Sequence, residues 1–252
     1  MKKLVIFIGL ILTLGVTTYA QKSPSETVIK FYRALKDKKY VEGFHVSVYR
    51  GAIEGLTPAE LKELEPDFAR TFSEIPDKID VKGEQINGET ATVFLKFEAI
   101  EEFQQITLIR INGEWLVGDQ ESLTMVNQQG KNFFFNSRIS VNEQEAILML
   151  SRIHSSEIIY AQKFNNTYAT LAELVKLQAL NEDMADSESS GYFFAMTMSE
   201  DKTSYAVTAT PKLYGKTGRI SFYLDQTGIL KGEDLQGKAA TNQSPVFQPK
   251  NN

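Results

Sequence analysis

The period of the hydrophobic pattern changes along this 252-residue chain, and the changes limit the folds it can adopt. Apolar residues recur at helical spacing up to Phe72 and alternate with polar residues after Pro76. They return to helical spacing from Val141 and alternate again from Gly191. A helical period buries one stripe of a helix, whereas alternation buries one face of a strand. Two successions of helices followed by strands predict an α+β protein with two folded units.

Helix-initiating signals occur twice in the predicted first unit, which spans residues 21–122. Ser23-Pro24-Ser25-Glu26 and Thr57-Pro58-Ala59-Glu60 both place a hydroxyl residue three positions before a glutamate, the pattern of a capping box. Proline suits the first helical position in both motifs. A further short helix is expected over residues 40–48, so three helices should precede the first strand.

Four alternating segments follow, and an Asn-Gly dipeptide separates the members of each pair. Asn-Gly between two such runs predicts a tight hairpin, because both turn residues tolerate positive φ. We therefore expect a four-stranded antiparallel meander. The predicted strands and turns are 79–86, Asn87-Gly88, 89–98, 103–111, Asn112-Gly113 and 114–119.

This order of elements, with "SPSETVIKFYRALKDKKY" at the front and "GETATVFLKF…ITLIRINGEWLV" at the back, resembles the NTF2-like superfamily of cone-shaped α+β domains. Some members isomerise or hydrolyse small apolar molecules with an Asp or His deep in the cone. The resemblance implies a ligand pocket lined by Tyr32, His45, Tyr49 and Trp115, with Glu98 nearby. The same aromatic residues also suit ordinary packing between helix and sheet, and no catalytic residue is assigned.

The second unit is predicted at residues 141–233. A long helix over 141–164 opens with Asn142 as its N-cap, and a shorter helix covers 170–180. Three strands follow, and Asp225-Gln226-Thr227-Gly228 forms a turn. The expected strands are 191–198, 204–210 and 219–225. Residues 234–252 are polar and rich in Gly, Pro and Asn, which predicts a disordered tail.

The segments "NEQEAILMLSRIHSSEIIYAQKF", "YATLAELVKL", "SGYFFAM", "YAVTATP" and "GRISFYLDQTGIL" resemble, in this order, the globular headpiece of type IV pilins and pseudopilins. The resemblance implies a long helix packed on a small antiparallel sheet. Pilins also carry a peptidase site and a long apolar helix before this region, and nothing before Val141 fits them. Some pseudopilins bind calcium in their last loop, but no acidic cluster surrounds Asp225, which favours a turn residue there. His154 is expected to be a helix-face residue.

Residues 123–140 are predicted to connect the two units. Phe133, Phe134 and Phe135 are unusual in a free linker, since three adjacent aromatic rings should not remain in water. We expect them to pack against one of the domains, as an interdomain contact, or to form a strand between the domains.

Residues 1–20 have the features of a signal peptide, with an uncleaved anchor as the alternative. Lys2 and Lys3 precede an apolar run over 4–16 that is too short to span a bilayer, and Thr18-Tyr19-Ala20 ends it with small residues. The chain has no cysteine, so an exported protein of this sequence depends on packing and not on disulfides. We expect a periplasmic or extracellular location, without stable membrane insertion after cleavage.

The charge and residue counts argue against several classes of function. With 27 basic and 32 acidic residues, the chain lacks the positive charge that nucleic acids and anionic lipids require. Two histidines, His45 and His154, and no cysteine make a metal site or other cofactor unexpected. No Gly-x-Ser-x-Gly elbow is present. Residues 214–218 resemble half of a phosphate loop but are expected to form a hairpin turn.

These observations predict an exported, non-enzymatic binding or interaction protein of the bacterial envelope or extracellular space. Its partner is expected to be a protein of the envelope or a small apolar ligand. Two alternatives remain open. One is an NTF2-like enzyme acting on a small apolar molecule, and the other is an accessory subunit of a pilus or type II secretion system.

Overall fold

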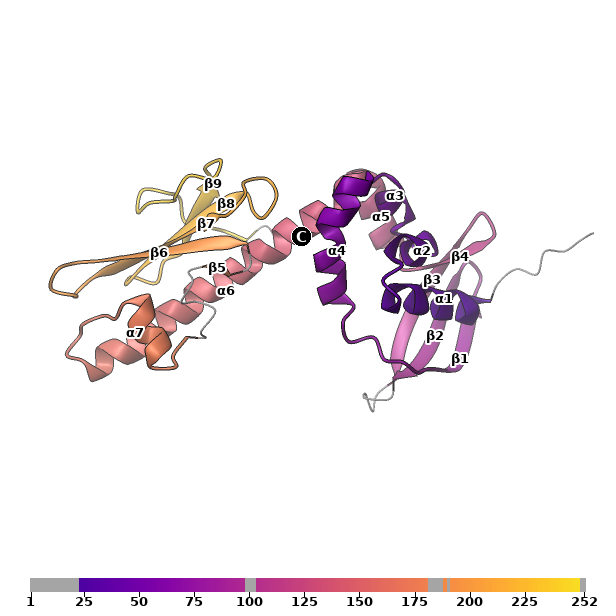
Figure 1. Cartoon of the computed structure of the whole chain (residues 1–252), viewed down its shortest axis with the longest axis horizontal. Coiled ribbons are helices and arrows are strands. Elements are labelled where there is room, and N and C mark those ends of the chain that lie inside the picture. Colours follow the sequence, from indigo (N-terminus) through magenta and orange to yellow (C-terminus); the bar gives the residue numbers. More distant parts are fainter. Residues whose placement is uncertain (1–22, 98–102, 181–187, 190, 250–252) are drawn as a thin grey trace, which may run out of the picture. The chain divides into compact units, whose positions relative to one another are not determined.

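The computed structural model describes residues 23–97, 103–180, 188–189 and 191–249. The chain is α+β and divides into two compact units (Figure 1). Unit 1 contains the chain up to Gly55 together with Phe68–Gln128, and unit 2 contains Leu56–Asp67 together with the chain from Gln129. The predicted signal peptide lies outside the described residues.

The helices of unit 1 begin where the capping motifs predict. In the first, the Ser23 hydroxyl accepts a hydrogen bond from the backbone of Glu26, and the Glu26 carboxylate accepts one from the backbone of Ser23. The second helix is shorter than predicted, and the helix directly after it was not predicted. The helices are α1 (Pro24–Lys36), α2 (Tyr40–His45), α3 (Arg50–Glu54), α4 (Pro58–Thr71), which contributes to both units, and α5 (Gln120–Gln129).

Four antiparallel strands form the predicted meander, in the order β1-β2-β3-β4. Asn112 and Gly113 both have positive φ, as a two-residue hairpin turn of this type requires. The first turn differs from the prediction, because Asn87 pairs with Thr90 and the loop is Gly88-Glu89. There, Gly88 alone takes the positive φ. The strands are β1 (Ile79–Asn87), β2 (Thr90–Phe97), β3 (Gln104–Ile111) and β4 (Glu114–Val117).

Both faces of this sheet are covered by apolar groups. Helix α1 lies against β1, β2 and β4. On one face, Val93, Leu95 and Leu108 are completely buried. The side chains of Ile109 and Leu116 point to the opposite face, where they pack with Val48. Apolar packing on both faces is therefore found at β3 and β4, whereas most of β1 is exposed.

The predicted connector is helical. Helix α5 ends at a short 3-10 turn, η1 (Gly130–Asn132), where Gly130 has a positive φ. Helix α6 (Phe133–Lys163) then runs for 31 residues. The long helix thus begins at Phe133 and not at Val141, and the three phenylalanines form its first turn and not a strand. No glycine or proline lies within α6, so nothing in its sequence interrupts the helix.

Asn142 is not the N-cap of this helix. It lies within α6, is buried, and its side-chain amide donates a hydrogen bond to the Thr217 carbonyl over 2.9 Å. A polar side chain inside a helix is stable when buried if its hydrogen bond is made. Among the described residues, no helix has both the length and the apolar character needed to cross a bilayer.

Unit 2 places α6 and the short α7 (Leu171–Lys176) with a five-stranded antiparallel sheet (Figure 1). Helix α7 begins at Thr170 with a capping box that includes Glu173 and ends earlier than predicted. The three predicted strands are present, and one further strand lies at each edge. In order, the strands are β5 (Glu188–Ser189), β6 (Tyr192–Met198), β7 (Tyr205–Pro211), β8 (Ile220–Asp225) and β9 (Lys231–Asp234).

The core of unit 2 lies between α6 and the sheet. Ala146, Leu150 and Ile153 from the helix are completely buried with Val207 and Phe222 from the strands. Ile158, which the helical spacing placed on the same face, is instead 45% exposed. The buried position after Ile153 is Glu157.

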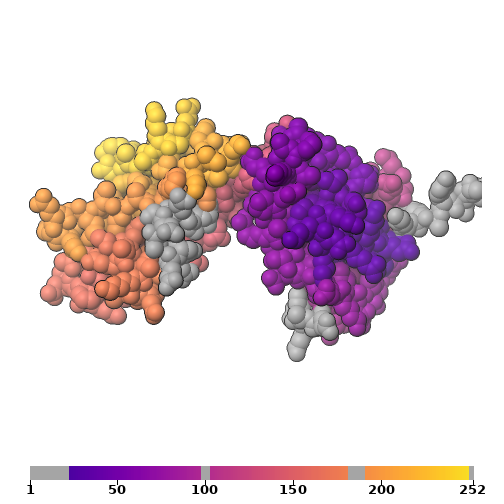
Figure 2. Space-filling view, in the orientation of Figure 1, coloured from indigo at the N-terminus to yellow at the C-terminus, as the bar shows by residue number. Residues whose placement is uncertain are grey.

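Residues 234–249 pack on unit 2, in contrast to the predicted disordered tail over 234–252, whose last three residues lie outside the described residues. The Gly232 amide donates to the Pro245 carbonyl over 3.0 Å, and the Phe247 amide donates to the Leu230 carbonyl over 2.9 Å. The Phe247 ring lies 5.1 Å from the Phe222 ring, between centroids. Figure 2 shows these last residues, in yellow, against the orange strands of unit 2. The segment therefore extends the β9 edge of the sheet.

Phe247→Ala tests this docking. Because the ring packs on the core without being fully buried, its removal should lower the free energy of unfolding by about 1–3 kcal/mol. Val246→Ala is the matched control, since Val246 is 58% exposed and its loss should cost less than about 0.5 kcal/mol. Urea denaturation followed by circular dichroism measures both. Equal stability of the two variants would contradict an anchored tail.

Candidate functional site

The structure does not bring the four predicted pocket residues of unit 1 together. The Tyr32 ring lies 5.8 Å from the Phe97 ring, at the end of β2. Trp115 pairs with Arg110, whose backbone amide donates to the Glu89 carbonyl beyond the beginning of β2. The 8 residues of β2 span about 24 Å, so Tyr32 and Trp115 mark opposite ends of the sheet. Burial raises the pKa of Tyr32.

The other two residues lie elsewhere in unit 1. His45 is exposed, and its Nδ1 atom is 2.7 Å from a Glu54 carboxylate oxygen. Tyr49 packs with Leu116 on one face of the sheet, whereas the adjacent Trp115 faces the other side. Trp115 is buried there beneath the Arg110 guanidinium, which is 5.2 Å from its ring centroid. These contacts are those of packing and surface ion pairs. Glu98 lies outside the described residues.

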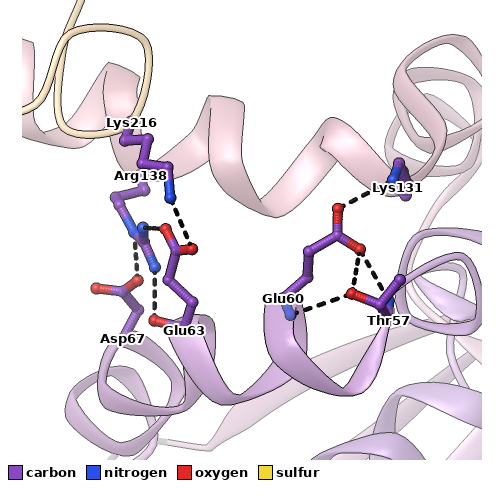
Figure 3. A network of polar contacts seen from close by, with 7 residues as sticks. All are labelled: Thr57, Glu60, Glu63, Asp67, Lys131, Arg138 and Lys216. Carbon is purple, nitrogen blue, oxygen red and sulfur yellow. Dashed lines mark hydrogen bonds and ion pairs between the residues drawn. The ribbon is translucent and has the colours of Figure 1, made fainter.

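A more organised set of polar groups occurs in unit 2, around Arg138 of α6 (Figure 3). The Arg138 Nε atom donates to the Asp67 carboxylate over 2.6 Å, and Nη1 donates to the Glu63 carboxylate over 3.1 Å. Nη2 donates to the Glu63 backbone carbonyl over 2.9 Å. The Arg138 side chain is only 12% exposed. A planar guanidinium can satisfy three acceptors at once, so it fixes the middle of α4 against α6.

Two lysines extend this network. Lys216, in the loop between β7 and β8, donates to the Glu63 carboxylate over 3.0 Å and thereby lowers the pKa of Glu63. Lys131 donates to Glu60 over 2.9 Å. Glu60 also accepts from Thr57, whose backbone amide is the main cause that lowers the pKa of Glu60 to about 2. Glu60 and Glu63 are therefore held ionised, facing basic groups from two other segments.

A groove of about 370 Å³ opens beside this network, within unit 2. Acidic groups of α4 line it on one side and basic groups of the β7–β8 loop on another, with an aromatic ring and two amides from the start of α6. Its volume is at the lower end of the range for small-molecule sites. The lining residues are Glu60, Glu63, Asn132, Phe135, Asn136, Gly215, Lys216 and Arg219.

Arg219 uses few of the hydrogen-bond donors of its guanidinium within the protein. Its Nη2 atom donates to the Asn136 side-chain oxygen over 3.1 Å, and among the described residues no carboxylate pairs with its guanidinium. Its backbone amide is used separately, donating to Glu143 over 2.8 Å. An exposed guanidinium held by one neutral amide retains donors for an anionic group.

A second polar feature of unit 2 lies in its core. Glu157 is completely buried, and one carboxylate oxygen accepts from the Ala169 amide over 2.9 Å. The other oxygen has no hydrogen-bond partner among the described residues. Burial raises the pKa of Glu157 to about 7. The pKa of Tyr205 is raised by burial and, to a smaller extent, by the nearby Glu157 carboxylate.

The contacts of His154 and Asp225 are those of packing and of a turn. The His154 Nδ1 atom is 2.8 Å from the Tyr205 hydroxyl, and Gly228 lies so close that an added Cβ atom would stand 2.7 Å from Nε2. Asp225 accepts hydrogen bonds from the amide and hydroxyl of Thr227. The prediction that Asp225 is a turn residue is confirmed.

Sequence reasoning identified Glu60 only as a capping residue and did not identify the groove. A signal was present, because Glu60, Glu63 and Asp67 recur at helical spacing and share one face of α4. Their basic partners lie more than 70 positions away, beyond the reach of any local pattern. Comparisons with protein-family models, curated proteins and solved structures give no match.

Arg138→Met should destabilise unit 2 by about 2 kcal/mol or more, since it leaves partly buried acceptors of α4 without their donor. Lys131→Met is the matched control, because the Lys131–Glu60 pair is more exposed and should contribute less than about 1 kcal/mol. Urea denaturation compares the two variants. An unchanged free energy of unfolding in Arg138→Met would contradict a structural role for this network.

Glu157→Gln should alter the pH dependence of stability. The folded protein binds the carboxyl proton up to about pH 7, whereas the unfolded chain releases it near 4.5. Stability from this group is therefore complete below pH 4.5 and is lost as the pH rises towards 7. Between about pH 5 and about pH 8, the free energy of unfolding of the wild type should fall by about 2 kcal/mol from this group. Glu157→Gln should not show this loss.

The control for this measurement is Glu145→Gln, which changes an exposed carboxylate on the same helix. It should leave the wild-type pH dependence in place. Urea denaturation at a series of pH values measures all three proteins. Parallel curves for the wild type and Glu157→Gln would show that Glu157 does not titrate in this range.

Proposed function

We propose that this chain is an exported, non-enzymatic binding protein that holds a small molecule in the groove of unit 2. The proposal rests on one observation, the meeting of acidic and basic side chains around a 370 Å³ groove. Arg138 fixes the segments that carry these groups. Preorganised groups of this kind suit recognition, because little freedom is lost when a ligand binds.

The two fold resemblances are part of this proposal. Helices followed by a four-stranded antiparallel meander support an NTF2-like unit 1, and a long helix with an antiparallel sheet supports a pilin-like unit 2. The separation of Tyr32, His45, Tyr49 and Trp115 gives no support to an enzyme of the NTF2-like kind. The features of residues 1–20 support export to the periplasm or the extracellular medium.

One observation favours a second candidate function, an accessory role in a pilus or secretion system. Val141, Leu148 and Ile159 of α6 are each more than half exposed. Their separations of about two and three helical turns place them in one stripe. An apolar stripe on a long helix is suited to contact with another helix.

Retention of small molecules tests the binding function. The full chain is incubated with a low-molecular-mass extract of bacterial periplasm, and the molecules kept with it on ultrafiltration are identified by mass spectrometry. We expect wild type to retain at least one compound in unchanged form. Asn132→Trp, which places a large ring at the edge of the groove, should retain it at least tenfold less, about the loss of one good contact.

Gln144→Trp is the matched control, since it adds the same ring to an exposed position of α6 outside the groove. It should retain the compound as wild type does. Equal retention by Asn132→Trp, or no retained compound at all, would contradict a binding groove. A compound recovered in chemically altered form would instead indicate an enzyme.

A further inference from the structure

The side chains that line the groove carry opposite charges that balance. Glu60 and Glu63 contribute two negative charges from α4, and Lys216 and Arg219 contribute two positive charges from the β7–β8 loop and its end. A ligand with a net charge would meet as much repulsion as attraction. A ligand that is neutral overall but carries both charges can satisfy both sides.

The acidic and basic residues of the groove also differ in the hydrogen bonds that they already make within the protein. Both carboxylates accept from basic groups. The Glu60 Oε2 atom already accepts two hydrogen bonds from Thr57, but Glu60 Oε1 and both Glu63 oxygens accept one each and have room for a further donor. Lys216 is exposed, so its pair with Glu63 can open without a large loss of free energy. Arg219 is held by the Asn136 amide and keeps unused donors. The groove can therefore take an ammonium group at α4 and a carboxylate at Arg219.

The groove also has an apolar part. The Phe135 ring lines the groove, and the Arg138 guanidinium lies 5.5 Å from its centroid, which fixes the ring in place. Asn132, three residues before Phe135, adds a side-chain amide to the lining. A ligand with an apolar part near its charged groups can pack on this ring.

We propose that the groove binds an α-amino acid or a short peptide as its zwitterion, with the α-carboxylate on Arg219 and the α-ammonium on Glu60 and Glu63. This inference rests on the proposed function and names its ligand class. A free amino acid and a dipeptide share this chemistry and differ in the distance between the two charged groups.

Calorimetric titration of the full chain tests the proposal with defined probes. L-Phenylalanine and the dipeptide Phe-Phe carry both charges, N-acetyl-L-phenylalanine lacks the ammonium, and L-phenylalaninamide lacks the carboxylate. At least one of the two zwitterions should bind, and each blocked compound should bind at least about tenfold more weakly, as expected for one lost charge-assisted hydrogen bond. The stronger zwitterion identifies whether the groove suits an amino acid or a peptide.

Variants assign the two ends of the ligand. Arg219→Gln should weaken the zwitterion about tenfold and leave the amide unaffected, so that the difference between the two probes disappears. Glu63→Gln should do the same for the difference between the zwitterion and the N-acetyl compound. Arg152→Gln, at an exposed position of α6 outside the groove, is the control and should bind as wild type does. Circular dichroism verifies that each variant is folded.

Three results would overturn the inference. These are no binding of either zwitterion, tighter binding of a blocked compound, and a difference between probes that persists in Arg219→Gln. If the extract experiment still shows a compound retained by wild type and lost in Asn132→Trp, the binding function stands and the ligand class alone is wrong. If Asn132→Trp retains compounds as wild type does, the proposed function itself fails.

Discussion

Burial of one stripe of α6 against the five-stranded sheet is the constraint on which unit 2 depends. Ala146, Leu150 and Ile153 supply the helical side of the core, and without them the sheet would expose its apolar face. Because the helix continues from Phe133 without interruption, the same burial also fixes Arg138, which lies in the second turn of the helix. The position of the guanidinium thus follows from core packing further along the same helix.

The groove is a consequence of where Arg138 lies. Its three nitrogen atoms donate to Asp67 and to the side chain and backbone of Glu63, so the middle of α4 is fixed beside α6. The turn that carries Lys216 meets the same Glu63 carboxylate. A concave surface between three segments remains, lined by charges that these contacts leave partly unsatisfied. Packing in the core therefore determines the geometry of a polar surface site.

Local patterns in the sequence predicted the elements that local chemistry determines. The capping boxes at Ser23 and Thr57 and the Asn112-Gly113 turn are of this kind, because each depends on atoms within a few residues. The errors arose where distant contacts override a local preference. Asn142 has the chemistry of an N-cap, but its amide is satisfied by Thr217, so the helix continues through it.

The tail and the groove were missed for related reasons. A polar, proline-containing segment predicts disorder by composition, yet Phe247 packs on the core of unit 2 and Ala240 is buried. Composition averages over a segment and hides the few residues in it that pack on the core. The acidic face of α4 was readable from its spacing, but its partners on α6 and the β7–β8 loop are separated from it by more than 70 residues. Only the assembled fold brings them together.

Glu157 places a carboxyl group on the buried face of the same helix, which is unfavourable for its charged form. Its spacing from Ile153 places it on the buried stripe, and the pattern of apolar residues gave the next position, Ile158, in its stead. The burial of a carboxyl group is tolerated because the Ala169 amide donates to one oxygen, just before α7 begins. The second oxygen remains without a partner among the described residues, which disfavours the charged form. An apolar residue here would pack well but would leave the Ala169 amide unsatisfied. The carboxyl group therefore joins α6 to the start of α7, and its protonation allows this junction to remain in an apolar core.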